Sequence, residues 1–325
     1  MNDGRRWLRL LFIIMAVCSL TALCVSPIAA AQLGDIPVTA EFAAGMRAIA
    51  AMDPDEKIRN PDSMAKQFLS PAYWFWTALD EDYDKSKQFI KFYRVSSYYT
   101  INACTKHIDG ILQAAAEKNL EQVVIIGAGL DSRAYRFQEQ MPGVRFFEVD
   151  LPATVARKKE LILASVGKVP ATVVYVPVDY PKGGMDSALK QVGYDRKHKS
   201  LFICEGVTRY IDAAAVDRTM QFIAKNASPG SELVFDYIFE DIARGDFSKM
   251  PWARFRAVRM AAYGHPWKFG IAPDKAGAFV TSRGFEVISD LGSGELAQRH
   301  LLRSDGSIDG KPAPYVRMVH AVVKN

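Results

Sequence analysis

From residue 122 onward, short apolar runs alternate with amphipathic stretches of helical length. The apolar runs predict strands at 123–126, 145–149, 172–178, 200–204 and 232–237, and the stretches between them predict helices at 132–139, 153–165, 185–192 and 213–226. The runs are continuously apolar, as in a parallel sheet covered on both faces. A late strand pair is expected at 285–290 and 315–323. The pattern predicts an α/β fold with a doubly wound, mostly parallel sheet and a late antiparallel strand.

The region before residue 120 reads as mostly helical. Residues 40–52 are Ala-rich and periodic, a turn precedes a helical stretch at 64–69, and residues 98–116 fit one long helix. We therefore expect a helical N-terminal cap at 32–119 and a sheet domain at 120–325. Within the sheet domain, a lid inserted at about 239–270 carries aromatic side chains among basic ones.

The N-terminus has the parts of a secretory signal. Arg5, Arg6 and Arg9 precede an apolar run at 10–25, and an A-x-A site follows at 29–31. We expect residues 1–31 to be a signal peptide that exports the protein, and the arginine pair loosely resembles a twin-arginine signal. The alternatives are a membrane anchor, for which the run is short, and a cytoplasmic protein whose start is assigned too early.

Composition and charge exclude several classes. Hydrophobic residues make up 49% of the 325 residues, charged residues make up 24%, and the net charge of +5 is spread along the chain. With no run of five like charges, we expect no nucleic-acid partner. Beyond the leader, only Cys104 and Cys204 remain, both in apolar segments typical of buried thiols. Without CxxC, HExxH or a His cluster, we expect no metal site.

The first strand of the sheet runs into Gly127-Ala128-Gly129 and then a helix. This arrangement lets a ligand approach backbone N–H groups at a helix N-terminus. A dinucleotide pyrophosphate would favour a third glycine, where this chain has Ser132, and Asp131 would repel phosphates. The cationic amino-acid end of S-adenosylmethionine would tolerate Asp131. The stretch therefore favours S-adenosylmethionine over a dinucleotide.

Acidic residues follow the next strands. Asp150, followed by Leu151, can accept the two ribose hydroxyls of a nucleoside, although it can also cap the next helix. Asp179 can accept from an adenine amino group while Tyr180 packs on the ring, or it is an ordinary loop aspartate.

Glu205 directly follows the fourth strand, at the mouth of the sheet. A carboxylate there needs a cationic partner. The α-amino group of the ligand is one candidate, and Arg209 is the other.

Read in order, these strand ends resemble the leucine carboxyl methyltransferase family, which includes polyketide carboxyl O-methyltransferases and many bacterial S-adenosylmethionine-dependent methyltransferases. The resemblance covers about 60–237, and its motifs are "VVIIGAGLDSRAYRF", "FFEVDLP", "VDY" and "FICEGVTRYI". It implies a Rossmann-like methyltransferase sheet and S-adenosyl-L-methionine as cofactor. The cofactor-binding residues that follow are Gly127, Ala128, Gly129, Asp131, Asp150, Leu151, Asp179, Tyr180 and Glu205.

One position departs from the family. Members usually carry Ala-Arg in the helix before the first strand, and that arginine holds the methionine carboxylate. Here the helix reads "INACTKHIDG", so Cys104 takes the place of the arginine. Lys106 lies on a different face of the helix, and Arg94 is the other nearby cation that could compensate.

The resemblance implies an S-adenosylmethionine-dependent O-methyltransferase acting on a carboxylate or hydroxyl of a small apolar or aromatic acceptor. A carboxylate needs no base, whereas a hydroxyl would need one, with His107 and His265 as candidates, so no catalytic residue is assigned. The acceptor pocket is expected to be built from aromatic residues before the sheet and in the inserted lid, which cover the strand ends: Tyr73, Trp74, Trp76, Trp252, Phe255 and Trp267.

Two other functions stay open. An exported, non-catalytic relative that acts as a binding protein would explain both the leader and Cys104. An NAD(P)-dependent oxidoreductase would need the third glycine and a Tyr-x-x-x-Lys pair, which does not follow the fourth strand.

Overall fold

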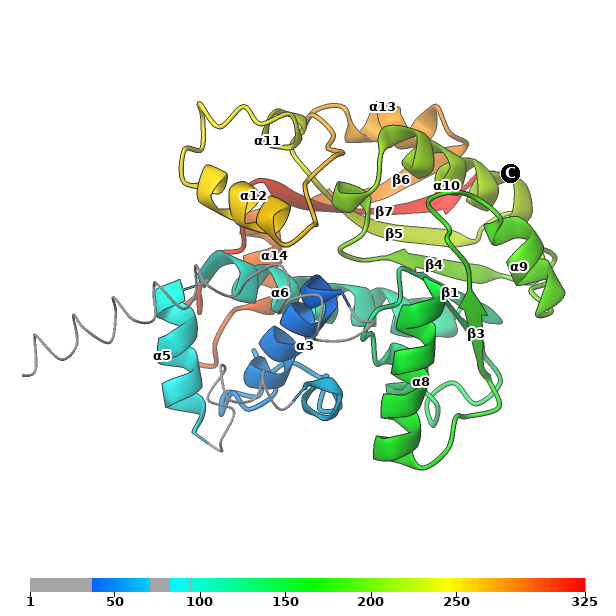
Figure 1. Ribbon diagram of the computed structural model, residues 1–325, viewed down its shortest axis with the longest axis horizontal. Coiled ribbons are helices and arrows are strands. Elements are labelled where there is room, and N and C mark those ends of the chain that lie inside the picture. The colour runs from blue at the N-terminus through cyan, green and yellow to red at the C-terminus, as the bar shows by residue number, and fades with distance from the viewer. Residues whose placement is uncertain (1–36, 71–81, 94, 325) are drawn as a thin grey trace, which may run out of the picture.

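A seven-stranded sheet in the order β3-β2-β1-β4-β5-β7-β6 forms the centre of the described chain (Figure 1). The structure is a computed structural model that describes residues 37–70, 82–93 and 95–324. The strands are β1 (Gln122–Ile126), β2 (Arg145–Asp150), β3 (Val173–Pro177), β4 (Ser200–Cys204), β5 (Glu232–Ile238), β6 (Phe285–Leu291) and β7 (Val316–Val323). The first five are parallel, and β7 runs antiparallel to both β5 and β6. The predicted α/β Rossmann-like fold, with its late antiparallel strand, is confirmed.

Side chains alternate between two hydrophobic cores, one on each face of the sheet. On β1, Val123 and Ile125 join the core under one set of helices, while Val124 and Ile126 join the other. The first face is covered by α3 (Val38–Ala50), α6 (Val95–Ala116) and α14 (Ser293–His300). The second is covered by α9 (Met185–Gln191), α10 (Ala213–Asn226) and α13 (Ala276–Thr281). Burial on both faces explains why the strands read as continuous apolar runs.

The helices follow the sequence pattern where it is long and differ from it where it is short. α8 (Pro152–Val166) and α10 lie where expected, and the Asp212 carboxylate caps α10 by accepting from the Ala215 amide at 2.7 Å. The stretch expected to be helical at 132–139 forms only α7 (Arg133–Arg136), and 64–69 forms the 3-10 turn η1 (Ala65–Phe68). Elements without a sequence prediction are α5 (Tyr83–Tyr93), η2 (Thr208–Tyr210), α11 (Glu240–Ala243), α12 (Ala253–Ala262) and α14.

The helices before β1 and the sheet share a core, since α3 and α6 contribute to the same cluster as β1. The division at residue 119 and the role of 239–270 as a lid stay predictions. The predicted leader, 1–31, lies outside the described residues. Among the residues that are described, none of the helices has both the length and the apolar character to span a membrane.

Two histidines meet where α14 packs on α6. His107 Nδ1 and His300 Nε2 lie 3.1 Å apart, so one ring donates to the other. Burial lowers the pKa of His107 to about 4 and that of His300 to about 3, and the nearby charges of Arg299, Lys106 and His320 act in the same direction. Both rings are therefore uncharged in the fold at neutral pH.

This pair should make the protein less stable in mild acid. Because the unfolded rings titrate near pH 6.5, unfolding takes up protons below that pH. The stabilisation is complete above about pH 6.5 and is lost as the pH falls towards 4. We expect the free energy of unfolding to fall by about 3–4 kcal/mol between pH 7 and pH 5, about half of it from each ring, measured by urea unfolding. His300→Gln should make the free energy of unfolding depend less on pH, whereas His198→Gln, which changes an exposed histidine, should not. Equal pH dependence in both variants would contradict the role given to the His107–His300 pair.

Candidate functional site

A cavity of about 320 Å³ opens at the carboxyl ends of the parallel strands. Its floor is the loop after β1, which pairs with β2 on one side and β4 on the other, so the cavity lies at the topological switch point of the sheet. Its walls come from the loops after β2, β3 and β4 and from α3, α6 and α12. In doubly wound sheets, this crevice is where ligands bind.

The loop after β1 is a tight turn that only glycine fits. Gly127 has φ of +66° and Gly129 has φ of +42°, and the amides of Gly127 and Ala128 both donate to the Val149 carbonyl, at 2.8 and 3.1 Å. A Cβ on Gly127 would lie 2.4 Å from the Val207 side chain. The two glycines thus bring bare backbone to the cavity floor, as the sequence predicted.

Asp150 lies at the end of β2, on the cavity wall. Its carboxylate accepts from the Gly129 amide at 2.6 Å and from the Leu151 amide at 2.7 Å. Burial raises the pKa of Asp150, and these two hydrogen bonds oppose the rise. One carboxylate thereby holds the loops after β1 and β2 together. Leu151, which is also predicted to bind the cofactor, lines the cavity beside it.

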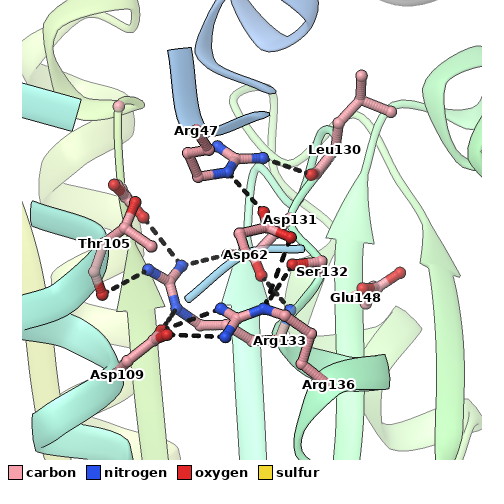
Figure 2. Close-up of polar contacts among 12 residues, drawn as sticks. Arg47, Asp62, Thr105, Asp109, Leu130, Asp131, Ser132, Arg133, Arg136 and Glu148 are labelled. Atoms are coloured by element: carbon pink, nitrogen blue, oxygen red, sulfur yellow. Dashed lines mark hydrogen bonds and ion pairs between the residues drawn. The ribbon is translucent and has the colours of Figure 1, made fainter. Parts of the chain in front are cut away.

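A buried cluster of charged side chains lies beside the glycine loop (Figure 2). At its centre, Arg133 Nε donates to Asp109 at 2.7 Å. The Nη1 of Arg133 contacts both Asp131 and Glu205, the latter at 2.9 Å. One guanidinium therefore joins α6, the glycine loop and the end of β4.

Two more arginines complete this cluster. Arg136 donates to Asp109 at 2.8 Å, and Arg47 of α3 donates to Asp62 and to the Leu130 carbonyl, each at 2.7 Å. We call the set the arginine cluster: Arg47, Arg133, Arg136, Asp62, Asp109, Asp131 and Glu205. Three guanidinium groups face four carboxylates, so the cluster has a formal excess of one negative charge.

The cluster changes the interpretation of Asp131 and Glu205. Both line the cavity, but both are ion-paired with Arg133, which sequence reasoning did not single out, and their contact with a cofactor stays a prediction. The alternative partner of Glu205, Arg209, instead pairs with Asp236 on β5. Asp131 therefore does not present an isolated negative charge to a ligand.

Of the two residues predicted after β3 to contact the cofactor, one lines the cavity and the other does not. Tyr180 lines the cavity, and its hydroxyl lies near Gly127. Asp179 is not among the lining residues; its carboxylate bonds Lys182 at 2.7 Å on the surface and is 41% exposed. A contact of Asp179 with a cofactor stays a prediction.

The position that departs from the family pattern also lines the cavity. Cys104 is buried there, and burial raises the pKa of its thiol, so it carries no charge. Lys106 points elsewhere and donates to the Lys57 carbonyl, and Arg94 lies outside the described residues. Among the described residues before β1, the cation that lines the cavity is Arg47. Its sequence signal is a single basic residue within the Ala-rich stretch of α3.

Half of the predicted aromatic pocket can be placed in the structure, and the three described residues do not line the cavity. Tyr73, Trp74 and Trp76 lie outside the described residues. In the inserted segment, Trp252 and Phe255 do not line the cavity and are 51% and 72% exposed.

The reason is the periodicity of α12. Its Arg256 and Met260, one turn apart, line the cavity, so Phe255 faces away from it. Trp267 is buried and does not line the cavity, but its ring packs 5.5 Å from that of Tyr315, which does.

Two buried polar atoms on the cavity wall have no hydrogen-bond partner within the described part of the chain. They are Nε of Arg209 and the hydroxyl of Tyr315. Arg256 and His265 line the same cavity, and burial lowers the pKa of His265. His107, the other candidate base, lies in the pair with His300 and does not line the cavity. Buried polar groups normally have a hydrogen-bond partner, and a ligand or a water in the cavity would supply one to both atoms.

Among the described residues, no group of three or more His, Cys, Asp or Glu side chains is placed to hold a metal ion.

The arrangement is that of a methyltransferase-type α/β domain, and sequence comparison places it in a family. The leucine carboxyl methyltransferase model matches residues 40–224, more than half of the chain, so the chain belongs to this family. A Mycobacteroides abscessus protein named "Putative S-adenosyl-L-methionine-dependent methyltransferase" is 30% identical over 185 residues. The matched segment covers 57% of this chain and 56% of that protein, so the chain spans little more than half the length of that relative.

Solved structures agree on the fold. A DUF574 family protein from Streptomyces avermitilis has a TM-score of 0.56 and 12% identity, covering 87% of this chain and 97% of its own. A protein from Thermobifida fusca described as a "putative methyltransferase" has a TM-score of 0.54 and 14% identity, covering 81% and 95%. At these identities the likeness shows the fold alone.

Proposed function

We propose that this chain binds S-adenosylmethionine in the cavity and transfers its methyl group to an oxygen of a small acceptor. The observation that carries the proposal is the meeting of the glycine loop with the arginine cluster, which holds a buried excess of carboxylates and places Asp131 and Glu205 on the cavity wall. S-adenosylmethionine carries a sulfonium and an ammonium against one carboxylate, a net charge of +1. The formal excess of −1 in the arginine cluster complements that charge, whereas a dinucleotide pyrophosphate would add to it.

The residues on the cavity wall fit the parts of this cofactor. The bare backbone at Gly127 and Gly129 leaves room for close approach, and the Asp150 carboxylate has lone pairs left for ribose hydroxyls. Glu205 keeps one carboxylate oxygen free of Arg133 and is available to the α-amino group. When bound, S-adenosylmethionine supplies a methyl group already activated by its sulfonium. The protein's part is then to align the acceptor and exclude water.

A carboxylate is the acceptor that the hydrogen-bond donors on the cavity wall favour. Arg209, Arg256 and the Tyr315 hydroxyl offer donors to acceptor oxygens, and the first and last have buried polar atoms that lack partners. Apolar side chains line the same wall and suit an apolar acceptor body: Phe42, Ile211, Met260 and Val316. A hydroxyl acceptor would use His265 as base, whose lowered pKa keeps the ring neutral.

The first test is calorimetric titration of S-adenosylmethionine into the purified chain, with NADH as the competing ligand. We expect micromolar binding of S-adenosylmethionine and none of NADH. Asp150→Asn should raise the Kd at least about tenfold, or 1.4 kcal/mol, because the amide has a single acceptor oxygen and no charge. Asp186→Asn, on the exposed first turn of α9, is the matched control and should leave the Kd unchanged.

The outcomes separate the three functions. Tighter binding of NADH would favour an oxidoreductase. If neither ligand binds at millimolar concentration, the methyltransferase proposal fails. The fold would then be better explained as a binding protein in which Cys104 replaced the family's arginine.

A further inference from the structure

Helix α12 has an outer face that the described part of the chain leaves exposed. Phe255 and Val258 lie three residues apart and are 72% and 60% exposed. Trp252, just before the helix, is 51% exposed although its ring packs 5.6 Å from that of buried Tyr315. The opposite side of the helix is anchored, because Ala253 and Met260 belong to the core cluster beneath it. Large apolar side chains gathered on one exposed face usually mark a surface that meets a partner.

The segment that carries this face holds formal charges of one sign. Residues 250–273 contain four basic side chains and no acidic one: Arg254, Arg256, Arg259 and Lys268. Among the residues that the structure describes, none of these four has a carboxylate within ion-pair distance, although other basic residues of the insertion do, such as Lys249 with Asp241 at 2.8 Å. Unpaired cations next to exposed aromatic side chains are the pattern of a helix that lies in the interface of an anionic bilayer.

The position of α12 supports the same partner. The helix lies at the outside of the molecule, at the carboxyl end of the sheet (Figure 1), and its Arg256 lines the cavity that Pro37 also lines. Pro37 follows the apolar run at 10–25 by only eleven residues, 26–36, which reach at most about 40 Å when extended. A membrane that held this run would therefore lie within reach of α12.

From the exposed apolar face, the cations without a carboxylate partner and the place of α12 beside the cavity, we propose that α12 docks on the surface of an anionic lipid bilayer. Phe255 and Val258 enter the interface, while Arg254 and Lys268 contact lipid phosphates. Docking would set the cavity mouth against the bilayer, where an amphiphilic acceptor could enter. That consequence rests on the proposed function, whereas docking itself requires neither cofactor nor catalysis.

The test uses the full chain and vesicles of equal parts phosphatidylcholine and phosphatidylglycerol, with pure phosphatidylcholine vesicles for comparison. Hydrogen exchange followed by mass spectrometry should show slower exchange in 250–263 when anionic vesicles are added, and no change in α8. Because this readout is local, vesicle binding through the N-terminal apolar run cannot imitate it. Added salt should weaken the protection.

Variants separate the apolar and charged contributions. Phe255→Ser/Val258→Ser should lower the partition coefficient on anionic vesicles about tenfold in co-sedimentation. The matched pair Leu163→Ser/Val166→Ser, also exposed and three residues apart but on α8, should leave it unchanged. Arg254→Gln/Lys268→Gln should lower the preference for anionic over neutral vesicles about tenfold.

Three results would overturn the proposal. The first is unchanged exchange in 250–263 while the chain pellets with vesicles. The second is wild-type partitioning by Phe255→Ser/Val258→Ser. The third is protection of 250–263 that rises with protein concentration alone, which would show that a second copy covers the face.

Discussion

Replacing Arg133 by methionine is expected to lower the free energy of unfolding by about 3–5 kcal/mol. The Arg133 side chain is 3% exposed and contacts the carboxylates of Asp109, Asp131 and Glu205. Methionine fills most of the volume but leaves these carboxylates without their shared cation. A buried charge that has lost its partner is the costly case, because its desolvation is no longer offset.

The pH dependence of this loss identifies its cause. Burial alone would raise the pKa of Asp131, but Arg133, with Lys158 and Arg47, holds it at about 2. With its folded pKa below the ordinary 3.8, this carboxylate stabilises the wild-type fold above pH 3.8, and the contribution is lost as the pH falls through 2. Without Arg133, burial dominates and the carboxylates bind protons in the fold. The difference in the free energy of unfolding between the variant and the wild type should therefore become smaller as the pH falls from 7 to 4.

Urea unfolding over that pH range measures the effect. The control is Arg157→Met, which removes a pair with Glu160 whose side chains are 45% and 66% exposed. An exposed pair of this kind contributes about 0–1 kcal/mol. If Arg133→Met and Arg157→Met lowered the free energy of unfolding by similar amounts, the arginine cluster would not act as a buried unit.

The sequence predicted the sheet because each strand carries its own signal. In β1 and β4 every residue is buried, so the apolar runs are unbroken and their ends are clear. The positions of Gly127, Asp150 and Glu205 at the cavity follow from the same signal, since parallel strands bring their carboxyl ends to one edge. Local pattern and topology were sufficient for these residues.

The arginine cluster could not be read in this way. The partners of Arg133 lie 24 residues before it, at Asp109, and 72 residues after it, at Glu205. No local periodicity encodes pairs at such separations, and an arginine in the first turn of a short helix reads as a solvated side chain. The argument that Asp131 repels phosphates had the same weakness, because it treated as isolated a charge that Arg133 pairs in the fold.

The aromatic residues of the inserted segment show a different limit of prediction from sequence. Trp252 and Phe255 had the right residue type for a pocket, and α12 does border the cavity. The sequence could not say which face of the helix turns inward, because both faces mix apolar and basic residues. Packing decides this: Met260 and Ala253 fit the core cluster beneath the helix, and that contact turns Phe255 outward.

Gly127→Ala is expected to cost about 3 kcal/mol of folding free energy. One part, about 1–2 kcal/mol, is the left-handed backbone at φ +66°, which an L side chain adopts poorly. The other part is steric: the new methyl group would lie 2.4 Å from the Val207 side chain and 2.9 Å from the Tyr180 hydroxyl. Val207 is β-branched and buried, so it has few rotamers with which to yield. Any displacement of it or of Tyr180 intrudes on the cavity that both line.

Gly167→Ala provides the control that isolates the steric part. Gly167 ends α8 with φ of +79°, and a Cβ there would meet nothing within 4 Å. It should therefore cost only the backbone part, about 1–2 kcal/mol, and leave S-adenosylmethionine binding unchanged. In Gly127→Ala, by contrast, the Kd should rise at least tenfold under conditions where the variant is folded. If Gly127→Ala and Gly167→Ala had equal free energies of unfolding, the glycine loop would have room for a side chain. The proposed close approach of the backbone to the cofactor would then lose its structural basis.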